Sequence, residues 1–219
     1  LDNNLGGSWR AAGSAVSGST TRRFFVEAQS DAWRYRKGTS EPPEDWNTLD
    51  FQEDDSWLAG HASIGFGDND DNTELTDMHE NYSTFYMRHT FVVDPEDGVP
   101  SLLKLGTYID DGAVFWINGH EVHRLSVPDG ELYHDSTGSS HEARWTEEII
   151  PNPKAVLREG ENVLAIHVLN AHIRSSDASG DAMLFIPAAG EVTTGTPTPG
   201  QPNSVFSENA PPQIRQVDH

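Results

Sequence analysis

Short segments in which apolar and more polar residues alternate with period two constrain the fold of this chain most. In residues 103–110, most apolar residues are followed by a more polar one, as a half-buried strand requires. In residues 163–169, three branched residues share one face, whereas Ala165 and His167 share the other. Both segments are therefore predicted to be β-strands.

A tight hairpin is predicted where Asn118-Gly119 separates two such segments, because this dipeptide tolerates the positive φ of a type I′ turn. Residues 153–157 favour a helix of one or two turns with Pro153 near its start. Further short strands, rich in aromatic or branched residues, are predicted at residues 85–93, 113–118, 121–125 and 183–186.

These many short strands, with 19 Gly, 13 Pro and little helix, predict an all-β fold. A sheet with one apolar face must bury it on another layer, so we expect an antiparallel β-sandwich of the jelly-roll type at residues 23–190. Residues 1–22 are predicted to be a linker or the end of a preceding module, and residues 191–219 a Pro-rich linker. Both ends look cut from a longer protein.

The charge of the chain excludes several classes of partner. The chain has 14 Lys and Arg against 35 Asp and Glu, a net charge of −21, which repels phosphate backbones and anionic lipids. No run approaches the roughly 20 apolar residues of a membrane span, and no export signal opens the sequence. The absence of Cys excludes disulfides, thiolate nucleophiles and Cys-ligated metals. We therefore expect no nucleic-acid partner and no membrane span.

Several motifs, in their order along roughly residues 23–188, resemble the galactose-binding-like jelly-roll modules of large exported bacterial multidomain proteins. They resemble more loosely the sugar-binding jelly roll at the front of β-galactosidase-type enzymes. The resemblance implies a carbohydrate-binding-module-like domain of an extracellular or cell-surface protein. The motifs are Trp33-Arg-Tyr35, Pro42-Pro43, Trp46, Asp54-Asp-Ser-Trp57, Gly65-Phe-Gly67, Tyr108 to Gly119, Leu157 to Ile166, and Ser175-Ser-Asp177.

The flanks resemble connecting sequence. The segment from Leu5 to Arg10 resembles the tail of a lamin-tail-like module, and the segment from Thr198 to Ser204 resembles linkers in surface proteins of aquatic bacteria. This resemblance implies that neighbouring domains of the same chain are partners of the module.

An acidic run near residue 70 places oxygen-bearing side chains at every second position, an arrangement that could converge on Ca²⁺ in an irregular loop. The run resembles the first half of an EF-hand loop, but Thr73 stands where the Gly of the sharp turn belongs and His79 replaces the closing Glu. A full EF-hand is therefore not expected, and a solvated acidic loop is the alternative. The candidate ligands are Asp68, Asp70, Asn72 and Glu74.

A second calcium possibility comes from the resemblance. Modules of this kind often hold a structural Ca²⁺ between an early loop and the segment entering the last strand, and Asp31, Asp177 and Asp181 lie at matching places. Ordinary turn chemistry also places Asp before a strand. The sequence does not choose between the two acidic groups.

Catalytic patterns are absent from the sequence. The ten His show no HxH or HExxH spacing, so surface or packing roles are expected for them. Gly-x-Ser-x-Gly is also absent, and 35 acidic residues single out no catalytic pair. We therefore predict that the chain is not an enzyme.

Aromatic residues suggest where a sugar could bind, because pyranose faces lie flat on rings while polar neighbours bond the hydroxyls. Trp33, Trp46 and Trp57 match framework positions and are predicted to pack. Trp116 alternates with Phe115 on the predicted hairpin, so we expect one ring to face the core and the other to be exposed.

The other sugar candidates surround a long polar stretch at residues 135–142. Long loops at the rim of a sandwich commonly carry binding sites. Tyr133, His134 and Trp145 bracket this stretch, and Arg144 and Asp129 are the predicted polar partners. A disordered loop is the alternative interpretation.

These observations predict a non-catalytic, extracellular carbohydrate-binding module with one structural Ca²⁺ in a larger secreted or surface protein. The main alternative is a structural spacer or adhesion domain without a sugar site. A polysaccharide-degrading enzyme domain is a third interpretation.

Overall fold

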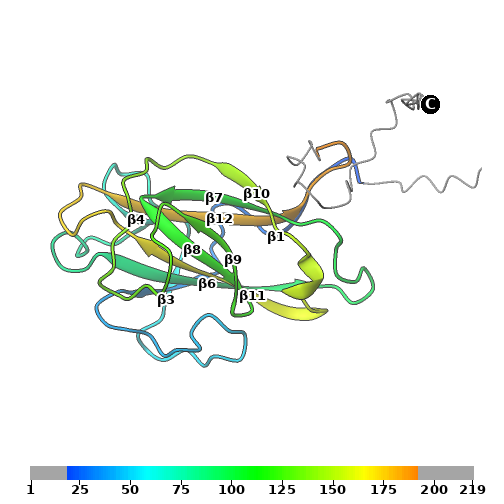
Figure 1. Cartoon of the computed structure of the whole chain (residues 1–219), viewed down its shortest axis with the longest axis horizontal. Helices are drawn as coiled ribbons and strands as arrows, with labels where there is room; N and C mark the ends of the chain where they lie inside the picture. The colour runs from blue at the N-terminus through cyan, green and yellow to red at the C-terminus, as the bar shows by residue number, and fades with distance from the viewer. Residues whose placement is uncertain (1–18, 192–219) are drawn as a thin grey trace, which may run out of the picture.

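The computed structural model describes residues 19–191, which form two β-sheets packed face to face (Figure 1). The predicted all-β sandwich is confirmed. The two predicted linkers lie almost wholly outside the described residues. No helix in residues 19–191 is both long and apolar enough to cross a bilayer.

Sheet A contains six strands in the order β10-β7-β12-β4-β5, with β1 pairing to the far end of β12. Its pairs are antiparallel apart from β4 with β5. The strands are β1 (Arg23–Val26), β4 (Ile64–Phe66), β5 (Thr73–Glu74), β7 (Lys104–Asp110), β10 (Thr146–Ile149) and β12 (Ala178–Ile186).

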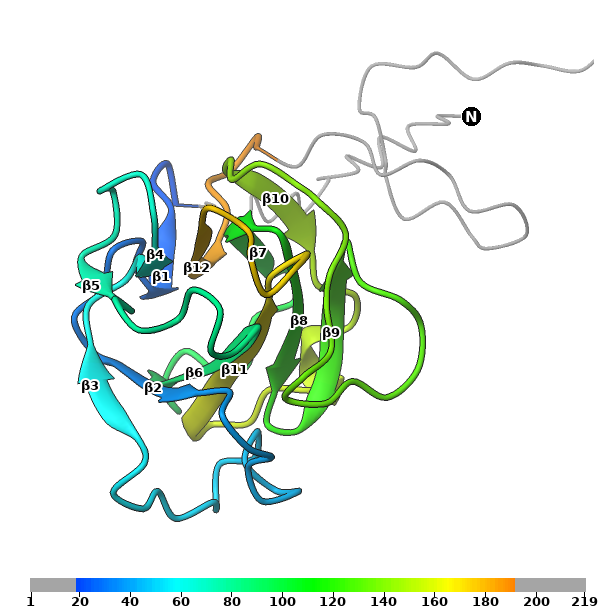
Figure 2. The same cartoon turned by 90° about the vertical axis from the view of Figure 1, so that its left-hand side faces the viewer.

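Sheet B contains six antiparallel strands in the order β3-β2-β6-β11-β8-β9 (Figure 2). They are β2 (Trp33–Lys37), β3 (Leu58–Gly60), β6 (Thr84–Val93), β8 (Gly112–Ile117), β9 (His120–Leu125) and β11 (Gly160–Leu169).

The main core lies between the sheets and follows the period-two pattern of the sequence. Leu105 and Ile109 of β7 and Leu164, Ile166 and Val168 of β11 belong to it and are fully buried. The strands predicted from alternation are therefore confirmed, as is the division of β11 into two faces.

The β8–β9 hairpin also forms as predicted. Asn118 and Gly119 have φ of 51° and 82°, the two positive values that a type I′ turn requires. The helix predicted at residues 153–157 is a single 3₁₀ turn, η1 (Pro153–Ala155). Asn162 accepts a hydrogen bond from the Asn118 amide at 2.8 Å and so links the hairpin turn to β11.

A second, smaller cluster covers the outer face of sheet B. The connection between β2 and β3 crosses this face (Figure 1) and packs Trp46 and Trp57 beside Tyr86 and Ala165. Trp33, Trp46 and Trp57 are all at most 8% exposed, which confirms their predicted packing role. Because both faces of β11 are covered, its outward residues are buried as deeply as its core residues.

The buried Arg88 fixes this connection on the sheet. Its guanidinium donates to the carbonyl oxygens of Trp46 and Thr48, the latter at 2.9 Å, and pairs with Glu53 at 3.2 Å. A buried cation is costly unless it is paired and hydrogen-bonded, so these contacts keep the connection in place.

Candidate functional site

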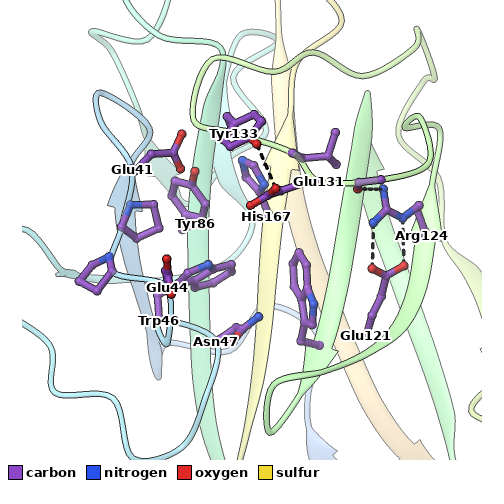
Figure 3. Close-up of a pocket in the computed structure, with 15 residues that line it drawn as sticks. Glu41, Glu44, Trp46, Asn47, Tyr86, Glu121, Arg124, Glu131, Tyr133 and His167 are labelled. Carbon is purple, nitrogen blue, oxygen red and sulfur yellow. Dashed lines mark hydrogen bonds and ion pairs between the residues drawn. The ribbon is translucent and has the colours of Figure 1, made fainter.

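A cleft of about 710 Å³ lies on the outer face of sheet B, next to the small aromatic cluster (Figure 3). Its floor comes from the outward side chains of β6, β11 and β8, and its rim comes from the β2–β3 connection, from β9 and from the segment after β9. The lining residues are Glu41, Pro42, Pro43, Glu44, Trp46, Asn47, Tyr86, Trp116, Glu121, Arg124, Gly130, Glu131, Leu132, Tyr133 and His167.

Strand register places the floor residues together. His167 of β11 lies opposite Tyr86 of β6, and Ala165 lies opposite Trp116 of β8. Because β11 turns Leu164, Ile166 and Val168 inward, the intervening residues must point to the cleft side. The alternation that builds the core therefore also builds the floor of the cleft.

Tyr86 and His167 form the deepest part of this floor. Their rings stack with centroids 4.2 Å apart and an interplanar angle of 15°, and each residue is only 2% exposed. Within residues 19–191, neither the Tyr86 hydroxyl nor His167 Nε2 has a hydrogen-bond partner. Leaving a buried polar atom unpaired costs about 1–3 kcal/mol, so each of these two atoms lacks a favourable contact in the free protein.

Burial also sets the protonation of this pair. Desolvation lowers the pKa of His167 to about 3, so its imidazole is neutral at physiological pH. Desolvation raises the pKa of Tyr86 well above its ordinary value, so the hydroxyl keeps its proton. The floor thus offers neutral hydrogen-bonding groups, which suit uncharged hydroxyl groups of a ligand.

Tryptophan rings form one wall of the cleft. Trp46 meets both Tyr86 and Trp116 edge to face, with ring centroids 4.9 and 5.5 Å apart, and stacks on Trp57 at 6.1 Å. Trp116 is half-buried, whereas Phe115 is fully buried in the core. The expectation that one ring faces the core is therefore confirmed for Phe115, whereas Trp116 is only partly exposed because it packs on Trp46.

Charged residues form the rim. Arg124 pairs with both carboxylate oxygens of Glu121, at 2.8 and 2.9 Å, and this contact lowers the pKa of Glu121 (Figure 3). The Tyr133 hydroxyl donates to Glu131 at 3.0 Å. Glu41 accepts from the backbone N–H of His134 at 2.8 Å. These contacts hold the segment after β9 over the floor.

The sugar residues predicted from the sequence do not all meet at this cleft. Trp116 and Tyr133 line it, and Asp129 lies between two residues whose carbonyls accept from Arg124. His134 lines a separate cavity of about 440 Å³.

Arg144 and Trp145 lie at the other sheet. Trp145 is 41% exposed and packs against Tyr108 of β7, with ring centroids 5.6 Å apart. Arg144 is exposed beside it in the sequence. The structure therefore brings Trp116 and Tyr133 together and separates them from this pair.

The sequence interpretation missed most of the cleft. Its floor and rim also include Glu41, Trp46, Tyr86, Glu121, Arg124, Glu131 and His167. The signal that could have found the floor was the polar His167 on the face of β11 opposite three branched residues. The β2–β3 connection, which completes the wall, contacts the floor only through tertiary packing. Local sequence patterns do not predict such contacts.

The predicted calcium ligands are also dispersed. Asp68, Asp70 and Asp177 line a small hollow of about 90 Å³ at sheet A, together with Asp110 and Glu142. The Asn72 amide donates to the carbonyl of Ala62 at 2.7 Å. Glu74 is exposed on β5, Asp31 is exposed at another surface, and Asp181 is buried on β12.

This acidic hollow, defined by Asp68, Asp70, Asp110, Glu142 and Asp177, has the donor chemistry of a hard-cation site. Burial, followed by the charges of Asp111 and Asp177, raises the pKa of Asp110 to about 7. Among residues 19–191, however, no three His, Asp or Glu side chains are grouped so that they could hold a metal ion. The structure thus contains suitable donors without a formed coordination sphere.

Asp181 is satisfied by the protein itself. Its carboxylate accepts from the backbone N–H groups of Gln29 and Ala182 at 2.8 and 2.7 Å. Burial raises its pKa to about 6. Its contacts tie the loop after β1 to β12.

Comparison with known proteins gives partial structural alignments at low sequence identity. No protein-family model matches the chain, and no curated protein matches its sequence. A β-glucuronidase from Bacteroides uniformis has a TM-score of 0.49 and 16% identity over 76% of this chain. A glycosyl hydrolase family 2 member from Bacteroides cellulosilyticus has a TM-score of 0.48 and 17% identity over 76% of this chain.

A β-glucuronidase from an uncultured Clostridium species has a TM-score of 0.46 and 14% identity over 76% of this chain. The chain spans 18%, 21% and 29% of these three structures respectively. Each alignment thus covers only a minor part of the larger protein.

Proposed function

We propose that the chain is a non-catalytic carbohydrate-binding module and that the cleft on sheet B is its sugar site. One observation carries the proposal: the buried, unpartnered Tyr86 hydroxyl and His167 Nε2 lie on the floor of an aromatic-walled cleft. Sugar hydroxyls supply the missing partners, and the C–H faces of a pyranose pack on rings.

The size and composition of the cleft support a saccharide. Its volume of about 710 Å³ falls in the range of about 300–1,000 Å³ typical of small-ligand sites. The wall offers the rings of Trp46 and Trp116, and the rim offers Asn47 and four glutamates as hydrogen-bonding groups. A ligand with one apolar face and many hydroxyls satisfies both surfaces.

The protonation of Glu121 and His167 supports binding without catalysis by these two groups. A glycosidase needs one carboxylic acid that is protonated to donate to the leaving group. Arg124 instead lowers the pKa of Glu121 and keeps it ionised, and His167 is neutral and buried. These groups can recognise a sugar without protonating a glycosidic bond.

The wider setting is part of the same proposal. The motif resemblance to exported jelly-roll modules supports a location outside the cell, within a larger secreted or surface protein. In that setting the module would keep the parent protein on a polysaccharide while its neighbouring domains act.

Affinity electrophoresis against plant and marine polysaccharides, followed by calorimetry with oligosaccharides of the retarding polymer, tests the proposal. Trp116→Ala and Tyr133→Ala are expected to weaken binding at least about 10-fold, because each removes a ring at the cleft. Trp145→Ala is the matched control, since it removes an exposed ring at sheet A and should leave affinity unchanged.

Two outcomes would count against the proposal. Failure of every polysaccharide to retard the folded protein would favour the spacer function. Loss of binding in Trp145→Ala with full binding in Trp116→Ala would move the site to sheet A.

A further inference from the structure

The charge of the cleft is strongly one-sided. Its lining includes four glutamates, Glu41, Glu44, Glu121 and Glu131, against the single cation Arg124. His167 also lines the cleft but is neutral. The local excess of carboxylates has the same sign as the net charge of −21, so the field of the whole chain reinforces it.

Arg124 is committed to the protein. Its Nε and Nη2 atoms donate to Glu121, and Nη1 donates to the carbonyl oxygens of Pro128 and Gly130 at 2.5 and 3.1 Å. A bidentate contact with a ligand carboxylate needs two neighbouring donors of the guanidinium. To provide them, Arg124 would have to break its pair with Glu121 or its contacts with the Pro128 and Gly130 carbonyls.

Among the other carboxylates, Glu41 lies 2.7 Å from the His134 ring nitrogen, whereas Glu44 and Glu131 have no Lys or Arg partner within the described residues. Glu131 accepts only the Tyr133 hydroxyl, and Glu44 forms no hydrogen bond or ion pair in residues 19–191. Both glutamates are exposed, so a ligand can reach them. The rings of Trp46 and Trp116 lie in the same cleft, and a cation is attracted to such ring faces.

We propose that this cleft selects saccharides bearing protonated amino groups, such as chains of amino sugars, and disfavours chains of uronic acids. The inference rests on the proposed sugar site and adds the charge class of the ligand. Ammonium groups pair with Glu44 and Glu131, while the neutral floor of Tyr86 and His167 receives hydroxyl groups.

Calorimetry with three oligosaccharides of equal length tests this selectivity: one of glucosamine, its fully N-acetylated counterpart, and one containing glucuronate. The titrations are run at about pH 6, where the amino sugar is protonated. We expect the glucosamine chain to bind at least about 10-fold more tightly than the glucuronate chain, with the N-acetylated chain between them.

Charge-neutralising variants locate the effect. Glu44→Gln and Glu131→Gln are each expected to weaken binding of the glucosamine chain about 3- to 10-fold. Their effect on binding of the N-acetylated chain should be smaller. In the second variant the introduced amide keeps an oxygen that can accept from Tyr133. Glu96→Gln is the matched control, because it removes the same charge from an exposed turn between β6 and β7.

The outcomes separate this inference from the proposed function. Equal affinity for the glucosamine and N-acetylated chains would overturn the charge selectivity and leave the sugar site intact. An equal effect of Glu96→Gln would assign the preference to the net charge and also overturn it. No binding of any saccharide would instead overturn the proposed function itself.

Discussion

At the scale of single residues, unpartnered buried polar atoms identify the cleft. Within residues 19–191, six residues bury a side-chain nitrogen or oxygen without a partner, and two of them, Tyr86 and His167, line this cleft. Their rings are stacked and cannot turn away from the cleft without losing that contact. The cost of leaving the two atoms unpaired is the residue-scale reason to expect a ligand.

A pH-dependent prediction concerns Asp110. Burial raises its pKa to about 7, above about 3.9 in an unfolded chain, so the fold favours the protonated form. The stabilisation is therefore full below about pH 4 and is lost as the pH rises through about 7. Asp110→Asn should stabilise the protein progressively from about pH 5 to 8, by at least about 1 kcal/mol at the upper end.

Urea unfolding at several pH values measures this gain. Asp94→Asn changes the net charge equally at an exposed turn and should stay within about 0.5 kcal/mol of the parent throughout. A gain in Asp110→Asn that is the same at pH 5 and 8 would contradict the assigned ionisation.

At the scale of elements, the sequence predicts the strands and the tight turn better than it predicts which segments pack over the sheet. The period-two pattern predicts β7 and β11 because a pleated strand sends alternate side chains to opposite faces. Asn118-Gly119 predicts the β8–β9 turn because few residues accept two successive positive φ angles. Both signals are local, so the sequence carries them directly.

The cleft depends on contacts between distant segments, which local patterns do not encode. The sequence predicted a sugar site around residues 135–145, because Tyr133 and Trp145 flank a long polar stretch. In the structure, backbone bonds tie this stretch along the sandwich: Gly138 N–H donates to Asn170 and Ser139 N–H donates to Ser126. Tyr133 consequently reaches the cleft, while Trp145 packs at the opposite sheet.

Asn162 provides a stability prediction at this scale. It is fully buried, accepts from the Asn118 amide and from the backbone N–H of Arg158, and donates to the carbonyls of Arg158 and Gly160. Asn162→Ala leaves these groups unpaired, so we expect a loss of about 2–3 kcal/mol in the free energy of unfolding.

Chemical denaturation of Asn162→Ala beside Glu161→Ala checks this prediction. Glu161 is the exposed neighbour on the same strand, and its replacement should cost no more than about 0.5 kcal/mol. Equal losses in the two variants would show that the buried amide does not fasten the hairpin turn to β11.

We predict that Ca²⁺, if the protein binds it, binds at the acidic hollow at sheet A. Its carboxylates repel one another, and a bound cation relieves this repulsion and stabilises the native state by mass action. We predict that Ca²⁺ at about 1 mM raises the unfolding temperature and that EGTA reverses the shift. Asp177→Asn should reduce the shift, whereas Asp31→Asn, at another surface, should retain it.

Thermal unfolding with and without EGTA decides this prediction. An unchanged unfolding temperature at saturating Ca²⁺ would show that Ca²⁺ does not stabilise the native protein. A shift that depends on Asp31 would place it elsewhere.

At the scale of the whole molecule, the core that stabilises the fold lies between the sheets, and the cleft lies on the outer face of sheet B. The core between the sheets fixes the strand register, and sheet B is left with a face that is partly covered by the β2–β3 connection (Figure 1). This partial cover buries the floor of the cleft but leaves an opening beside it. The net charge of −21 of the chain favours neutral or cationic ligands over anionic ones.

Binding of a saccharide on the outer face of sheet B can be located residue by residue in solution. The most direct measurement is an NMR titration of the assigned protein with an oligosaccharide that binds in calorimetry. We expect chemical-shift changes to cluster at Tyr86, Trp116, Tyr133 and His167, with new protection of the Tyr86 hydroxyl. Changes centred on Trp145, or none at these four residues at saturating ligand, would contradict binding on this face.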